Sequence, residues 1–130
     1  MNNDGAQNDE SNDYFGMELL YNTVDSGLGN TGLYDGNISA IRWKGLGDGS
    51  GVVGQKGYAF TYDKDNKLKA AIYKVKTATG TTEVNNLNES LTYDHNGNIL
   101  TLVRNERMHK LLGGATVAFT PKMIDNMTYT

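Results

Sequence analysis

The residues best suited to chemistry lie in the stretch Asp94–Asn98, which reads D-H-N-G-N. Its aspartate and two asparagines match the first three ligand positions of a calcium-binding loop, D-x-N-x-N. Such a loop needs glycine at its sixth position and glutamate at its twelfth, where this sequence has Ile99 and Asn105. The stretch Asp63–Lys67 departs similarly, with lysine at the fifth position. We therefore predict Asp-led hairpin turns and no metal ligands, with weak calcium binding at a turn as the alternative.

Other motifs for catalysis or cofactor binding are incomplete. The segment Gly49–Gly54 matches G-x-G-x-x-G, but a dinucleotide site needs a helix to begin within that motif, and a strand-like segment follows here. His95 and His109 lack partners at the helical spacing of a zinc site. Cysteine is absent, and no serine lies in G-x-S-x-G. The sequence thus predicts no catalytic residues, no cofactor and no enzymatic activity.

Charge is distributed unevenly along the 130-residue chain. Four of the 15 acidic residues and none of the 12 basic residues lie within residues 1–13, so we expect this segment to be a disordered acidic tail without the features of a signal peptide. The remainder, residues 14–130, is nearly neutral and is predicted to form one domain. It has neither the basic stripe of a nucleic-acid-binding protein nor an apolar run of about 18 residues that would insert into a membrane.

A short pattern recurs along the chain. The segments 33–38, 61–68 and 92–99 each contain Tyr-Asp, a turn, a polar residue and then Ile or Leu, and a fourth begins at residues 127–130. Because recurrence at a loose period is typical of repeat architectures, we interpret the pattern as structural. The residues that define it are Tyr34, Asp35, Gly36, Asn37, Tyr62, Asp63, Asn66, Tyr93, Asp94, Gly97, Asn98 and Tyr129.

The residues around each repeat predict β-hairpins. Segment 58–62 alternates aromatic residues with small ones, and segments 38–43, 68–75 and 99–104 are predicted return strands. Asp35-Gly36 predicts a two-residue turn with positive φ at both positions. Gly97 and Asn66 suit the left-handed position that follows a type I turn. The leading aspartate of each turn can accept hydrogen bonds from the turn N–H groups.

The predicted fold class is all-β, with consecutive antiparallel β-hairpins in one open, twisted sheet. Residues 15–21 are expected to add a strand, and residues 44–57 and 76–88 to form loops. Residues 105–112 fit either one short helix, capped by Asn105, or an extension of the preceding strand. Edge strands left unpaired invite self-association, so we expect a dimer or larger assembly through strand edges or sheet faces.

Trp43 is the candidate ligand contact. Its ring and the nearby tyrosines could stack on the apolar face of a sugar, because aromatic faces pack against such surfaces. The alternative is cross-strand aromatic packing within the sheet. The repeat tyrosines recur at one position of the pattern, which favours a structural role for them, while Trp43 remains open.

Together with the Tyr-Asp pattern, four longer blocks resemble those of a known family. They are "DYFGMELLYN" (13–22), "GNISAIRW" (36–43), "GYAFTYD" (57–63) and "IDNMTYT" (124–130). These blocks resemble a bacterial subgroup of the RHS (rearrangement hotspot) or YD-repeat proteins, over about residues 13–130. The resemblance implies that residues 14–130 are a YD-repeat β-hairpin domain holding three to four repeats.

The resemblance also implies a function and a location. YD repeats of this family form hairpins that pair into a long sheet, which in several members closes into a shell around a C-terminal toxin. The implied function is a structural segment of a secreted or cell-surface protein, with other repeats of a larger parent chain, and a toxin cargo, as partners. The alternative is an adhesion module that binds carbohydrate or protein. The family's Asp-Pro-rich self-cleavage motif has no counterpart here, because the chain's one proline is Pro121.

Overall fold

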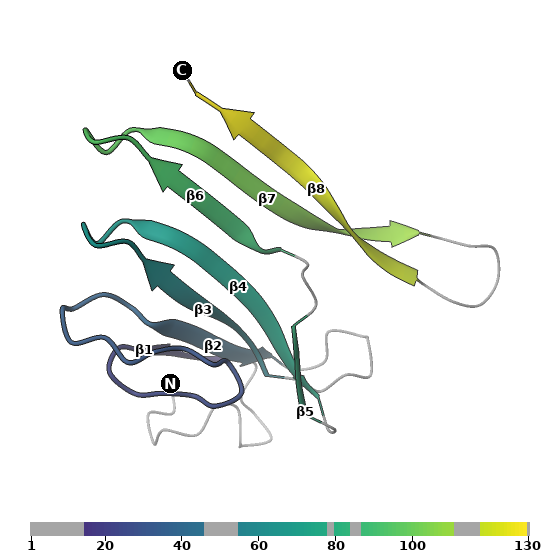
Figure 1. The fold of residues 1–130 in the computed structure, drawn as a ribbon. Coiled ribbons are helices and arrows are strands. Elements are labelled where there is room, and N and C mark those ends of the chain that lie inside the picture. Colours follow the sequence, from purple (N-terminus) through teal and green to yellow (C-terminus); the bar gives the residue numbers. More distant parts are fainter. Residues whose placement is uncertain (1–14, 46–54, 78–79, 84–86, 111–117, 130) are drawn as a thin grey trace. The chain divides into compact units, whose positions relative to one another are not determined.

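The computed structural model describes residues 15–45, 55–77, 80–83, 87–110 and 118–129, and all regular secondary structure there is β-strand (Figure 1). The expected tail (1–13) and the G-x-G-x-x-G segment (49–54) lie outside these residues. Period-2 alternation of apolar and polar residues explains the preference for strands. The strands are β1 (Phe15–Leu20), β2 (Ala40–Gly45), β3 (Lys56–Tyr62), β4 (Leu68–Thr77), β5 (Gly80–Glu83), β6 (Glu89–Tyr93), β7 (Ile99–Lys110) and β8 (Ala118–Thr128).

The strands form one sheet in the order β1-β2-β3-β4-β6-β7-β8, and β5 pairs with β4. The pairings with a defined register are antiparallel. The predicted all-β fold of antiparallel strands in an open sheet is therefore confirmed. By its internal contacts the chain divides into two units. Unit 1 is Met1–Phe60 with Lys74–Glu83, and unit 2 is Thr61–Tyr73 with Val84–Thr130.

One of the two alternatives for residues 105–112 and parts of both predicted loops were wrong. The helix near residues 105–112 is absent from 105–110, which continue β7 and pair with β8; residues 111–112 lie outside the described part. The alternative, a strand extension, is confirmed there. Pairing with β8 gives hydrogen-bond partners to the backbone N–H and C=O groups, which a short helix would instead pair with one another. In the predicted loop 76–88, residues 76–77 extend β4 and Gly80–Glu83 form β5 beside it. In the loop 44–57, residues 44–45 belong to β2 and 56–57 to β3.

The first repeat does not form the predicted two-residue hairpin. β1 pairs with β2, and residues 21–39, which we call the strap, connect them. Gly36 has a φ of 89°, but Asp35 is not in the left-handed region, so the turn that needs positive φ at both positions is absent. Asp35 instead accepts a hydrogen bond from the Asn37 N–H at 3.0 Å.

The strap contributes Leu28 to the apolar core of unit 1. Leu28, Leu20 and Ala40 form a buried cluster. Gly57 of β3 makes room for Leu28, because a Cβ there would lie 2.7 Å from both the Ile41 carbonyl oxygen and a Leu28 methyl carbon. A leucine side chain thus packs over a glycine on the strand beneath it.

A short turn within the strap presents Leu28 to the sheet. The Gly29 N–H donates to the Asp25 carbonyl oxygen at 2.8 Å, and Gly29 takes a φ of 67°. The Lys74 ammonium of β4 donates to the Leu28 carbonyl oxygen at 2.6 Å. This charged hydrogen bond holds the end of the turn, where carbonyl groups otherwise lack partners.

We predict that Leu28→Ala destabilises the fold by about 2–5 kcal/mol, the range for removing a buried leucine side chain from a packed site. Val24→Ala is the matched control in the same strap, because Val24 is 61% exposed. It should change the free energy of unfolding by no more than about 0.5 kcal/mol. Urea denaturation followed by circular dichroism measures both, and equal effects of the two substitutions would contradict the packing of Leu28.

Candidate functional site

The second and third repeats form turns of the same construction in unit 2. In each, the aspartate N–H donates across the turn, Asp63 to the Lys67 oxygen and Asp94 to the Asn98 oxygen, both at 2.9 Å. The aspartate carbonyl oxygen accepts from the N–H three residues on, at 3.2 and 3.1 Å respectively. The residues that donate these N–H groups are Asn66 (φ 60°) and Gly97 (φ 88°). The predicted left-handed positions after the turns are confirmed.

The aspartate carboxylates bind their own turns. Oδ1 of Asp63 accepts from the N–H groups of Asp65 and Lys67, both at 2.9 Å. Oδ1 of Asp94 accepts from the N–H groups two and four residues on, at 2.9 and 2.8 Å. Its Oδ2 accepts from the Asn98 side-chain amide at 2.9 Å. These bonds engage Oδ1 of Asp63 and both carboxylate oxygens of Asp94.

The hydrogen bonds lower the pKa of Asp94. The largest contribution comes from the Asn98 side-chain amide, followed by the Asn98 N–H, because both stabilise the charged carboxylate. Within the described residues, no three His, Cys, Asp or Glu side chains gather in a way that could hold a metal ion. His95 is exposed in the turn, and His109 lies in β7, where its side chain is outside the described part.

The repeat tyrosines occupy different environments. The Tyr93 hydroxyl donates to the Leu68 carbonyl oxygen at 2.7 Å, and the Lys67 ammonium lies 5.6 Å from the centre of the Tyr93 ring. Tyr62 is half-buried, Tyr129 is 48% exposed and Tyr34 is 87% exposed. Tyr93 therefore ties two strands together, whereas Tyr34 stands in the strap without comparable burial.

A pocket of unit 2 lies beside Tyr93. β4 and β6 pair through Ala70–Ala71 and Glu89–Ser90, and the Tyr93 hydroxyl bridges to β4 beyond that pairing. The carboxylate in the pocket wall, that of Asp63, accepts hydrogen bonds from its own turn, and the Thr92 hydroxyl is hydrogen-bonded to the Thr101 hydroxyl at 2.6 Å. The lining residues are Asp63, Lys69, Leu91, Thr92 and Tyr93.

Trp43 lies in a row of aromatic rings in unit 1. It stacks on Tyr58 of β3, with ring centres 5.9 Å apart and planes at 29°. Tyr58 in turn stacks on Phe60 at 6.1 Å and 15°. All three side chains are half-buried. Cross-strand aromatic packing at Trp43 is thus part of the structure, and the rings keep some exposed surface.

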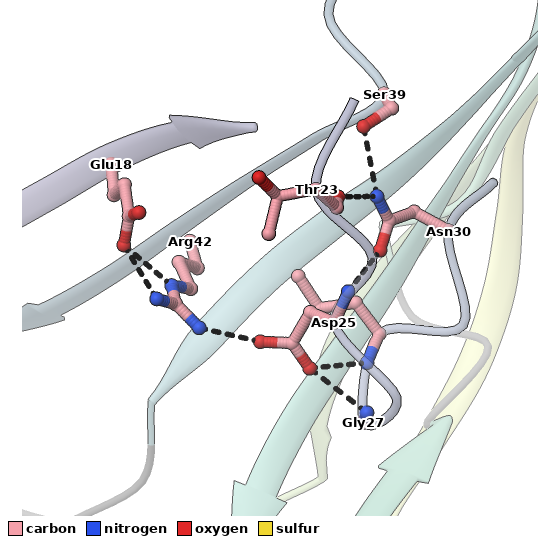
Figure 2. A network of polar contacts seen from close by, with 8 residues as sticks. Glu18, Thr23, Asp25, Gly27, Asn30, Ser39 and Arg42 are labelled. Carbon is pink, nitrogen blue, oxygen red and sulfur yellow. Dashed lines mark hydrogen bonds and ion pairs between the residues drawn. The ribbon is translucent and has the colours of Figure 1, made fainter. Parts of the chain in front are cut away.

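Sequence reasoning missed an ion-pair network that anchors the strap (Figure 2). Arg42 of β2 binds Glu18 of β1 at 2.6 Å and Asp25 of the strap at 2.7 Å. The other oxygen of Asp25 accepts from the N–H groups of Gly27 and Leu28 at 2.8 and 3.1 Å. Burial raises the pKa of Asp25, but the hydrogen bonds from Leu28, Arg42 and Gly27 together outweigh it and hold the pKa below its ordinary value. The D-S-G-L-G stretch was the available signal, because aspartate and glycine at these spacings are typical of a turn.

Asn30 is buried at the centre of the same network. Its amide donates to the Thr23 carbonyl oxygen at 2.9 Å and to the Ser39 hydroxyl at 2.8 Å, and its oxygen accepts from the Asp25 N–H at 2.8 Å. Ser39 is fully buried, and its hydroxyl donates to the Leu20 carbonyl oxygen at 3.1 Å. These bonds satisfy polar groups that would be costly to bury unpaired.

In unit 2, Asn88 precedes β6 as Ser39 precedes β2. The Ser39 carbonyl oxygen accepts from the Phe60 N–H at 2.9 Å, and the Asn88 carbonyl oxygen accepts from the Asn105 N–H at 3.0 Å. The Asn88 side-chain oxygen also accepts from the Tyr73 N–H of β4 at 2.8 Å. Each of these buried polar side chains thus bonds to the strand on one side, and its residue's carbonyl oxygen accepts from the strand on the other.

Comparison with known proteins adds no relative. No family model, curated protein or solved structure matches this chain. Within the part of the chain that the structure describes, no helix has the length and apolar character that crossing a membrane requires. The function is therefore argued from the chain's own residues, above all from the Asp-led turns and the aromatic row.

We predict that the charge of Asp94 stabilises the fold in a pH-dependent way. A carboxyl group whose pKa is lowered by folding stabilises the folded state above its unfolded-state pKa, here the ordinary value of 3.8. That stabilisation is lost as pH falls through the lower pKa of the folded state. Asp94→Asn keeps a side-chain acceptor and removes the charge, so the wild type should be more stable than this variant near pH 7. Thermal unfolding from pH 7 to pH 2 should show the difference shrinking below pH 3.8, and a constant difference would contradict the role of the charge.

We predict that Tyr93→Phe lowers the free energy of unfolding by about 0.5–1.5 kcal/mol, the usual net value of one hydrogen bond. The substitution removes the bond to the Leu68 carbonyl oxygen and keeps the ring. Tyr34→Phe is the matched control, since Tyr34 is 87% exposed, and it should have no measurable effect. Urea denaturation of both variants makes the comparison, and an unchanged Y93F variant would show that the hydroxyl does not stabilise the sheet.

Proposed function

We propose that this chain is a non-enzymatic structural segment of a secreted or cell-surface RHS/YD-repeat protein, contributing to a β-sheet shell or scaffold of the toxin-enclosing type. The observation that carries the proposal is the shared construction of the Asp63 and Asp94 turns. Each joins a strand that ends in tyrosine to a strand that begins with Leu or Ile. Two copies of one hairpin design within a single sheet are what a repeat scaffold requires.

The chemistry of the repeated residues supports a structural role. Asp63 and Asp94 use their carboxylates to order backbone N–H groups, and the Tyr93 hydroxyl is bonded to a backbone carbonyl oxygen. A catalytic acid or base needs access to a substrate proton. Side chains whose polar atoms are hydrogen-bonded to the protein's own backbone hold strands in position instead. The partners proposed for this segment are further repeats of a parent chain.

A second candidate function is binding of a glycan or a partner protein. It is favoured by the row Trp43, Tyr58 and Phe60, whose rings are only half-buried. Aromatic rings that retain exposed surface can stack on the apolar face of a sugar. A glycan array probed with the wild-type protein and Trp43→Ala separates the two functions. Binding that is reproducible and lost in W43A supports this candidate, and absence of binding supports the scaffold.

The scaffold proposal is tested in the cells that produce the protein. An antibody against this chain should detect it in the culture medium or at the cell surface, within a protease-resistant particle larger than the 14.2 kDa chain. The expectation follows because a closed sheet leaves few exposed strand edges for cleavage. Size-exclusion chromatography and protease treatment of intact cells provide the measurement. Detection solely in the cytosol, as a protease-sensitive 14.2 kDa species, would contradict the proposal.

A further inference from the structure

The register of β1, β2 and β3 sorts the side chains of unit 1 onto two faces. Residues directly opposite one another in an antiparallel pair point to the same face. Glu18 lies opposite Arg42, and Arg42 opposite Gly57. This face carries the strap, through the Arg42–Asp25 ion pair and the packing of Leu28 at Gly57.

The other face is apolar, and the strap does not cover it. Met17 lies opposite Trp43, Leu19 opposite Ile41, and Ile41 opposite Tyr58. We call this surface the apolar face. It consists of Phe15, Met17, Leu19, Ile41, Trp43, Tyr58 and Phe60, with Lys56 of β3 as the charged residue opposite Trp43.

The exposure of the apolar face is large for a protein of this size. Phe15, Met17 and Leu19 are 60%, 56% and 40% exposed, and the remaining four side chains are half-buried. At about 150–250 Å² for each large aromatic side chain and somewhat less for Met and Leu, the exposed apolar area is on the order of 400 Å². Contiguous apolar patches larger than a few hundred Å² mark interaction sites.

We propose that the apolar face binds the same face of a second copy of this chain. Two such faces pack as the layers of a β-sandwich do, with side chains interdigitating across about 10 Å. A symmetric dimer brings the same patch of each copy into contact. The apolar face carries little charge, so few like charges come close together in such a dimer. Joining two patches buries on the order of 800 Å², below the standard 1,600 Å² of stable complexes. The dimer is therefore weak and reversible.

Trp43 reports directly on this contact. It is the chain's one tryptophan and lies within the apolar face. When a tryptophan ring leaves water, its fluorescence emission shifts to shorter wavelength, and acrylamide quenches that emission less because it reaches the ring less easily. Both signals should therefore change with protein concentration over about 1 µM to 1 mM, which covers the dissociation constants of weak complexes.

The test compares lysine substitutions at two exposed methionines. Met17→Lys places a charge within the apolar face, where Met17 is 56% exposed, so the folded monomer tolerates it. Met123→Lys is the matched control in β8 of unit 2, where Met123 is 51% exposed. Sedimentation velocity measures association, and circular dichroism checks that both variants fold.

The expected result is a dimer in the wild type and in M123K, with association at least about tenfold weaker in M17K, because burying an unpaired charge disfavours assembly. The concentration dependence of Trp43 fluorescence should disappear in M17K alone. A wild-type monomer at every concentration overturns the proposal. So does association weakened by M123K and not by M17K. Acrylamide protection of Trp43 that is independent of concentration also overturns it, because another segment of the same chain would then cover the face.

Discussion

A single layer of β-sheet has two faces, and the chain must bury at least one of them to fold. Unit 1 does so with the connection between its first two strands. The strap crosses one face, its Leu28 side chain packs at Gly57, and Arg42 binds it through Asp25. The apolar cluster is small, so the hydrophobic term alone is limited. Ion pairs and buried hydrogen bonds fix where the strap lies.

Buried polar side chains recur where a strand begins between two neighbours. Ser39 does this before β2, and Asn88 does it before β6. At Asn88 the side-chain oxygen accepts from a backbone N–H of the neighbouring strand, that of Tyr73. At Ser39 the hydroxyl adds a second hydrogen bond to the Leu20 carbonyl oxygen, which already accepts from the Ser39 N–H. This arrangement is costly to disrupt, since one substitution would leave a buried donor or acceptor unpaired. It is a second repeated device beside the Asp-led turns.

The Asp-led turns show why a structural motif can resemble a metal site. Both need oxygen atoms at alternate positions of a short loop. In this chain the donors facing the Asp94 carboxylate are N–H groups of its own backbone and the Asn98 amide. The same residue types therefore order a reversal of the chain.

The sequence by itself determined the features that depend on neighbouring residues. Alternation predicted most of the strands, and glycine or asparagine after Asp-led turns predicted the positive φ at Asn66 and Gly97. Only the tertiary structure decided that residues 105–110 are strand, because their backbone partners lie in β8. It also decided that Asp25 binds Arg42, and that Tyr34 is exposed while Tyr93 ties two strands. Local conformation is encoded within a few residues, whereas pairing and burial depend on segments that meet only in the folded chain.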